Sequence, residues 1–163
     1  RALGYAQEAH QRASAKFGDE HATTNFLLLN WARVLSESGR SVEAIDKVRV
    51  AHERSLRLYG PTSQRTQYAA VIRAQVELDA GRTEQALPLI KQLDPALLKA
   101  GSTFDLWPAI VDALRGIALQ QRGDAAAARP LLDSALEALK KDENWEQPTR
   151  LYVMAKRARA RLP

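Results

Sequence analysis

The sequence predicts an all-α protein in which one pair of helices recurs at a constant interval. Gly39, Gly81 and Gly123 are evenly spaced and define a 42-residue period, and an alanine follows each glycine five positions later. A small residue precedes each glycine by seven positions, and these residues are Ala32, Ala74 and Gly116. A further column of equivalent positions is apolar and consists of Val48, Ile90 and Leu132. Self-similarity at such a period is typical of repeat arrays, so we expect an α–α solenoid of about eight helices.

Composition and charge narrow the class of protein. With 45% hydrophobic and 26% charged residues in 163, the chain has the composition of a folded domain and not of a disordered one. The absence of cysteine excludes disulfides and thiolate metal sites, and no apolar run approaches the roughly 20 residues of a membrane helix. The net charge of +5 lies in residues 147–163, which hold five Lys or Arg and no acid, so residues 1–146 balance to zero.

The first full unit, about 18–60, follows a half repeat at 1–17 and predicts two helices. Apolar residues recur at helical spacing from Thr24 to Ser38, and this stripe consists of Phe26, Leu29, Ala32, Val34 and Leu35. Gly39 follows as a helix C-cap, because glycine adopts the left-handed conformation at little cost. The second helix begins at Ser41, and its stripe consists of Ala44, Ile45, Val48, Ala51, Ser55 and Leu58. Gly60 and Pro61 end the unit.

The second unit, about 61–101, repeats this plan with one interruption. A helix over 62–80 ends before Gly81, and another begins at Thr83. Asp94-Pro95 breaks this second helix, because proline lacks the backbone donor and disfavours helix at the residue before it. We expect Asp94 to cap a short helix that runs through Ala100.

The third unit, about 102–144, contains helices over 105–122 and 125–141, with Pro108 in the first turn of the former. A final helix over 147–161 has an apolar side made of Leu151, Ala155, Ala158 and Leu162. Its cations occupy the other faces, which predicts a capping helix with a polar outer surface.

The turn signals resemble those of tetratricopeptide repeats. That family's signature is a small residue, a glycine seven positions later and an alanine five positions after that, as at Ala32, Gly39 and Ala44. The 42-residue spacing is similar to that of kinesin light chains and many bacterial proteins, which carry G-x-x-H-P-x-T between repeats. Gly18-Asp-Glu-His21-Ala-Thr-Thr24 matches that motif except at the proline. The likeness is strong over 18–100, and it implies a right-handed superhelix that binds a peptide or protein surface without catalysis.

The resemblance also implies which residues line the groove. In this family the first helix of each pair faces a partner with positions three before, one after, and four or five after the small residue. The corresponding residues are Leu29, Arg33, Ser36 and Glu37 in the first unit, Val71, Gln75, Leu78 and Asp79 in the second, and Ala113, Ile117, Gln120 and Gln121 in the third. Asn30 matches the second asparagine of an L-N-N-L-A stretch that holds peptide backbone in light-chain relatives.

The chain begins within a repeat, so we expect a fragment of a longer protein. The family context implies a regulatory module of a bacterial protein and a cytoplasmic location. The aromatic residues in or beside first helices are Trp31, Tyr68, Phe104 and Trp107. We expect them in the core, unless they cluster on the groove side, where they would anchor a partner.

The residues form no recognisable catalytic, cofactor or metal motif, so we expect neither an enzyme nor a bound cofactor. His10 and His52 are repeat equivalents, His21 lies in a turn, and no H-E-x-x-H pattern occurs.

Two alternative functions stay open. The basic residues Lys156, Arg157, Arg159 and Arg161 suggest nucleic-acid binding, although the neutral body favours a solvated capping helix. Self-association is the other alternative, because the first helix lacks its predecessor. No membrane partner is expected.

Overall fold

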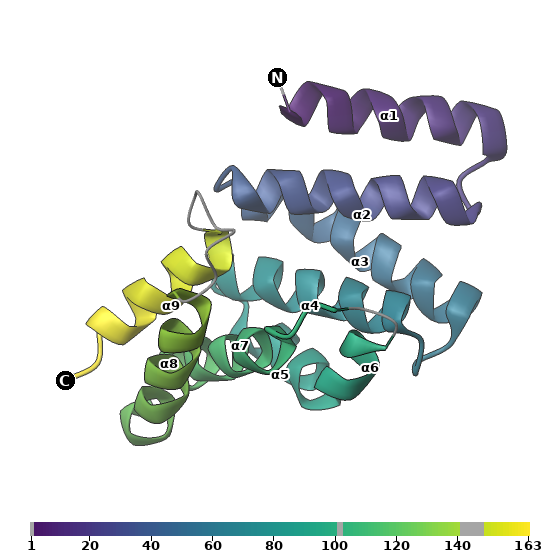
Figure 1. Cartoon of the computed structure of the whole chain (residues 1–163). Helices are drawn as coiled ribbons and strands as arrows, with labels where there is room; N and C mark the ends of the chain where they lie inside the picture. The colour runs from purple at the N-terminus through teal and green to yellow at the C-terminus, as the bar shows by residue number, and fades with distance from the viewer. Residues whose placement is uncertain (1, 101–102, 141–148) are drawn as a thin grey trace.

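The structure, a computed structural model, describes residues 2–100, 103–140 and 149–163. Over these ranges it contains nine α-helices and no strand, which confirms the predicted all-α class. The helices are α1 (Ala2–Phe17), α2 (Ala22–Glu37), α3 (Ser41–Tyr59), α4 (Gln64–Asp79), α5 (Thr83–Gln92), α6 (Pro95–Lys99), α7 (Trp107–Gln121), α8 (Ala125–Lys140) and α9 (Arg150–Ala160) (Figure 1). None of these nine helices is long and apolar enough to cross a membrane.

The regular spacing of the sequence reappears in the helix ends. Helix α4 is offset from α2 by one full period at both its first and its last residue, and α3, α5 and α8 begin at the evenly spaced positions 41, 83 and 125. Gly39 has a φ of 75°, and its N–H donates to the Ser36 carbonyl at 2.9 Å while the Arg40 N–H donates to the Leu35 carbonyl at 2.9 Å. Gly81 and Gly123 close their turns with the same pair of bonds. These Schellman turns require positive φ, which explains the recurring glycine.

The predicted break at Asp94-Pro95 is confirmed and brings the helix number to nine over the described ranges. Helix α5 ends at Gln92, and the Asp94 side chain accepts the Ala96 N–H at 2.8 Å to cap α6. The Asp94 N–H donates to the Gln67 side chain of α4 at 2.9 Å, so α4 helps to hold this corner.

Several helices begin at other residues than the sequence predicts, and two residues expected to be buried are exposed. Helix α4 begins at residue 64 instead of 62, and α7 begins at 107 instead of 105, where Asp105 forms an ion pair with Lys99 instead of continuing the helix. The final helix begins at Arg150, while residues 147 and 148 lie outside the described part of the chain. Phe26 and Leu58 were expected on buried stripes, but both are exposed because no described element covers their side of α2 and α3.

Helices pack chiefly on their neighbours in sequence, while α2, α4 and α7 lie side by side. One apolar cluster joins α2, α3 and α4, and a larger one joins α4 to α9. The small residues seven before each turn glycine are fully buried where helices cross. At Gly116 a Cβ atom would lie 2.7 Å from Cγ of Leu132, so glycine makes room for the larger leucine.

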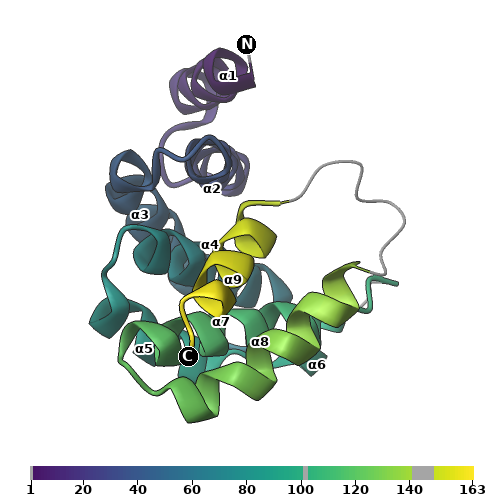
Figure 2. The same cartoon turned by 90° about the vertical axis from the view of Figure 1, so that its left-hand side faces the viewer.

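Helix α9 lies against α7 and α8, as a capping helix would. Its N-terminal end also reaches the C-terminal ends of α2 and α4, through hydrogen bonds from Arg150 (Figure 2). The last helix therefore touches the first full pair of helices as well as the last.

Candidate partner-binding groove

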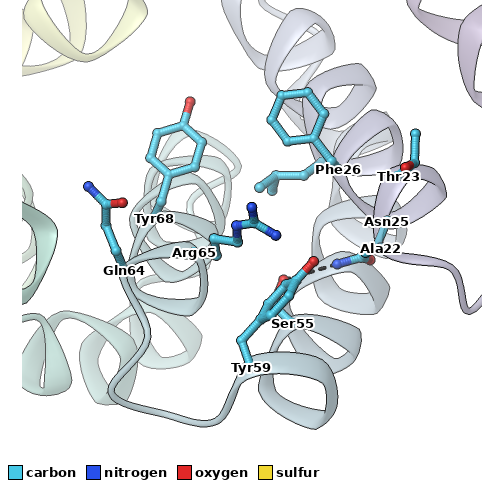
Figure 3. A pocket seen from close by; sticks show the side chains of 10 residues that line it. Ala22, Thr23, Asn25, Phe26, Ser55, Tyr59, Gln64, Arg65 and Tyr68 are labelled. Atoms are coloured by element: carbon cyan, nitrogen blue, oxygen red, sulfur yellow. Dashed lines mark hydrogen bonds between the residues drawn. The ribbon is translucent and has the colours of Figure 1, made fainter. Parts of the chain in front are cut away.

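The N-terminal halves of α2 and α4 enclose an open pocket whose floor is the end of α3. The pocket has a volume of about 430 Å³, and its lining includes Asn25, Phe26, Leu29, Tyr59, Arg65 and Tyr68 (Figure 3). A smaller hollow of about 160 Å³ continues it and is lined by Phe26, Leu29, Asn30, Arg33 and Tyr68. The two hollows share three residues, and together we call them the α2–α4 groove.

The two helices that form the walls of the groove, α2 and α4, begin at equivalent positions of the repeat, each after an N-cap residue. His21 precedes α2 and accepts the Thr23 N–H on Nδ1 at 3.1 Å, and Ser63, its repeat equivalent, accepts the Arg65 N–H at 3.2 Å before α4. His21 is therefore a helix N-cap. At the floor, Asn25 donates to the Ala51 carbonyl at 3.0 Å, which ties α2 to α3. The walls are thus fixed by local caps and by buried hydrogen bonds.

Aromatic rings dominate the groove. The Phe26 side chain is 63% exposed and lies across from Tyr68, with Arg65 between them (Figure 3). The Arg65 guanidinium lies 5.0 Å from the Tyr59 ring centre, a cation–π contact. Tyr68 is supported from behind by Trp107, whose ring centre lies 6.1 Å away in an edge-on arrangement. An exposed phenylalanine facing a braced tyrosine is suited to hold an apolar side chain of a partner.

The polar groups of the groove are mostly donors. The Arg33 guanidinium donates to Oδ1 of Asn30 at 3.0 Å, so Asn30 orients the arginine. Burial raises the pKa of the Tyr68 hydroxyl, with Arg33 opposing and Glu37 adding to the shift. Tyr68 therefore stays a neutral phenol at physiological pH and can donate a hydrogen bond. Arg33, Arg65 and Tyr68 together offer donors beside an apolar wall.

Only some of the residues predicted to contact a partner line this groove. Leu29, Asn30 and Arg33 of the first unit line it, although Leu29 is itself only 5% exposed. The expectation that Val71, Gln75 and Ile117 are open to a partner is wrong, because all three are buried between helices.

The remaining predicted positions mostly bond within the chain. Ser36 is buried and accepts from Gln75 at 3.3 Å, while Leu78 and Ala113 are core residues. Gln121 donates to the Leu78 carbonyl at 2.9 Å, so it joins α7 to α4. Glu37 and Asp79 both bond to Arg150 of α9.

Sequence reasoning missed Phe26, Tyr59 and Arg65 as groove residues. A signal was present, because Phe26 and Tyr68 are repeat equivalents and give the two walls matching aromatic rings. Phe26 also shares helical spacing with core residues of α2, which concealed its exposure. Tyr68, Trp107 and Phe104 do cluster, and Phe104 and Trp107 ring centres lie 5.1 Å apart in an edge-on arrangement.

The basic face of α9 is smaller than its composition indicates. Arg159 pairs with Asp133 at 2.5 Å and Arg150 pairs with Asp79 at 2.7 Å. Lys156 and Arg157 on α9 and Arg161 directly after it are exposed, and within the described ranges no ion pair engages them. The face available to phosphates therefore holds three of the five cations.

The histidines have structural surroundings. His52 is buried on α3, and its Nδ1 lies 3.3 Å from Nη1 of Arg73, which can only donate. Burial, assisted by Arg73, lowers the pKa of His52 to about 4. His10 lies beside the Trp31 ring, 5.7 Å between centres. Among the residues that the structure describes, no group of three potential metal ligands comes together.

Comparison with protein-family models finds no match to this chain, and comparison with curated proteins finds none either.

Proposed function

We propose that this chain is a non-catalytic binding module that holds a peptide segment of a partner protein in the α2–α4 groove. The observation that carries the proposal is the exposed Phe26 opposite Tyr68, beside the groove residues Leu29, Asn30 and Arg33. The proposal keeps the resemblance to tetratricopeptide arrays of a bacterial regulatory protein as its context, and the groove geometry supports it independently of that resemblance.

The groove offers what a small number of binding anchors need. A large apolar side chain buried against Phe26 and Tyr68 contributes about 1.5–3 kcal/mol. Arg33 is already oriented by Asn30, so it loses little side-chain freedom when a partner group bonds to it. The pocket volume of about 430 Å³ is enough for one or two side chains and falls within the range of ligand sites.

Selection from a random peptide library displayed on phage tests this proposal with the intact chain. We expect selected peptides to lose at least about tenfold in affinity, a change of about 1.4 kcal/mol, for Phe26→Ala and for Arg33→Ala. The matched control is Val42→Ala, because Val42 is 72% exposed on α3 and lies outside the groove lining. Equal affinity for Phe26→Ala and Val42→Ala would place the binding site elsewhere, and failure to select any peptide would contradict peptide binding.

A second candidate function is binding of a nucleic acid through the three exposed cations at the C-terminal end of α9. The observation that favours it is that Lys156, Arg157 and Arg161, on α9 and at its C-cap, have no acidic partner among the described residues. Self-association stays a prediction, and Tyr5 on α1, with 69% of its surface exposed, is an aromatic residue that it would bury.

A further inference from the structure

We propose that Arg150 closes the C-terminal end of the α2–α4 groove and that α9 thereby limits what the groove admits. The docking of α9 stands independently of the proposed function, whereas its effect on a partner rests on that function. Hydrogen bonds from Arg150 to Glu37 and Asp79, which are far from it in the sequence, hold the N-terminal end of α9 in this position.

Arg150 is held at the ends of α2 and α4, and its guanidinium binds Asp79 of α4. Its Nε and Nη2 donate to the two carboxylate oxygens of Asp79 at 3.0 and 2.7 Å, and its backbone N–H donates to Glu37 at 2.8 Å. Ser41 at the start of α3 donates to the same Asp79 oxygen as Nε. The Arg150 side chain also lies over the Gly39 turn, with Nη1 at 3.8 Å from a Cβ placed there. A bidentate pair of this kind fixes orientation as well as distance.

Among the three equivalent helix ends, the arginine side chain binds at the end of α4, where Asp79 stands. Glu37, Asp79 and Gln121 are repeat equivalents, each the last residue of its helix. Thr83 donates to Gln121 at 2.5 Å, which repeats the bond from Ser41 to Asp79 one unit later. Acids therefore stand at the two positions that Arg150 reaches, while an amide stands at the third. The Asp79 side chain is only 8% exposed, so without Arg150 its charge would lack its main partner.

This site lies at the end of the groove. On α2, Glu37 follows Arg33 by one helical turn, and Arg33 lines the smaller hollow. Between α2 and α4, Gln75 donates to Ser36 and is 5% exposed, just before the level of Arg150. A peptide that lies along α2 past Arg33 would therefore meet Arg150. To go further, it would have to displace the N-terminal end of α9.

Release of α9 would expose apolar residues. Leu151, Met154, Ala155 and Ala158 of α9 belong to the same buried cluster as α7 and α8. Met154 is the single methionine of the chain, and the chain has no cysteine. Met154 oxidation therefore reports on α9 alone, and an introduced cysteine reports on its own position alone.

The first test follows oxidation of Met154 by hydrogen peroxide with mass spectrometry. We expect Arg150→Ala to oxidise about tenfold faster than wild type, and Asp79→Asn to oxidise faster as well, because each removes one side of the pair. The matched control Arg157→Ala removes an exposed cation of the same helix and should leave the rate unchanged. Amide exchange of α3, followed in parallel, should stay unchanged. Unchanged oxidation in Arg150→Ala, or an equal rise in α3 exchange, would overturn the proposal.

The second test asks whether release opens the groove. Gln75→Cys places a thiol at the closed end, and Phe26→Cys places one in the open part. With an aromatic disulfide reagent, we expect Arg150→Ala to accelerate labelling of Cys at position 75 about tenfold and to leave labelling at position 26 unchanged. Faster Met154 oxidation without faster labelling at position 75 would overturn closure of the groove by α9. Neither test uses a peptide, so failure of peptide selection and failure of this proposal are separate results.

Discussion

Two gaps between parallel helices, α2–α4 and α4–α7, have equivalent positions in the sequence but different contents. The first is an open groove with an exposed Phe26 and a half-buried Arg33, and the second is closed, with Ile117, the repeat equivalent of Arg33, in the core. Trp107 packs against Tyr68 in the second gap, where the first gap has open space. The comparison teaches that one backbone plan yields either an open groove or a core, depending on which side chains stand at the equivalent positions.

The largest expected difference between the two gaps is in stability, and substitutions at the equivalent positions 33 and 117 test it. Ile117 is 2% exposed, so Ile117→Ala leaves a cavity and should lower the free energy of unfolding by about 3 kcal/mol. Arg33→Ala removes a partly exposed side chain and should change it by less than about 0.5 kcal/mol while weakening peptide binding. Urea unfolding followed by circular dichroism measures both. Similar losses of stability would mean that the two gaps are equally part of the core.

His10 on α1 and His52 on α3 are repeat equivalents, and their burial makes stability depend on pH. Burial first, and Arg73 second, lower the pKa of His52 from 6.5 to about 4, so the unfolded chain takes up a proton at a higher pH than the folded chain does. This contribution to stability is present above pH 6.5 and is lost as the pH falls toward 4. Between pH 6.5 and about 4.5 the free energy of unfolding should fall by about 2 kcal/mol on this account.

The test is urea unfolding of His52→Gln and of His10→Gln across that pH range. The pKa of His10 is also lowered, chiefly by burial, so His10→Gln should remove part of the pH dependence. We expect His52→Gln to remove more of it, because His52 is the more deeply buried of the two. An unchanged slope in His52→Gln would show that other groups cause the pH dependence.

The contact between α7 and α8 at Gly116 differs from the equivalent contacts of the first two units and should have a smaller effect on stability. A Cβ atom at this position would lie 2.7 Å from Cγ of Leu132, whereas the equivalent Ala32 and Ala74 already carry one. Gly116→Ala should therefore lower the free energy of unfolding by about 1–2 kcal/mol, although alanine favours helix over glycine by about 1 kcal/mol.

The matched rescue for Gly116→Ala is Leu132→Val. It recreates the alanine and valine combination of Ala32 and Val48 in the first unit. If the clash is the cause, the double variant should lose less stability than the sum of the two single variants. Additive losses in urea unfolding would contradict that explanation.

Much of the fold could be predicted because its signals are local. Gly39 needs a positive φ whatever surrounds it, and Asp94-Pro95 interrupts a helix by removing its own donor. Helix starts and turns accordingly fell within a few residues of their expected positions. The third unit lies beyond the strong likeness over 18–100 and still keeps its Schellman turn at Gly123.

The site was predicted only in part because exposure depends on what stands opposite a side chain. Phe26 has the helical spacing of a core residue, and only the empty space beside α4 makes it a surface residue. Ile117 has the same repeat position as the groove residue Arg33 but lies in the core. The pair of Arg150 with Asp79 joins helices far apart in the chain, and no spacing rule in the sequence points from one to the other.

The smallest expected effect concerns the outer face of α9, which is the solvated side of the closed half of the molecule. Lys156→Gln, Arg157→Gln and Arg161→Gln combined should leave the melting temperature unchanged, because these side chains are exposed and the described structure gives them no ion pair. They should also leave peptide capture by the α2–α4 groove unchanged. Fluorescence anisotropy with a labelled oligonucleotide at low salt decides the alternative function. Salt-sensitive binding by wild type that the triple variant loses would establish a nucleic-acid face at the end of α9, and the absence of binding would exclude that alternative.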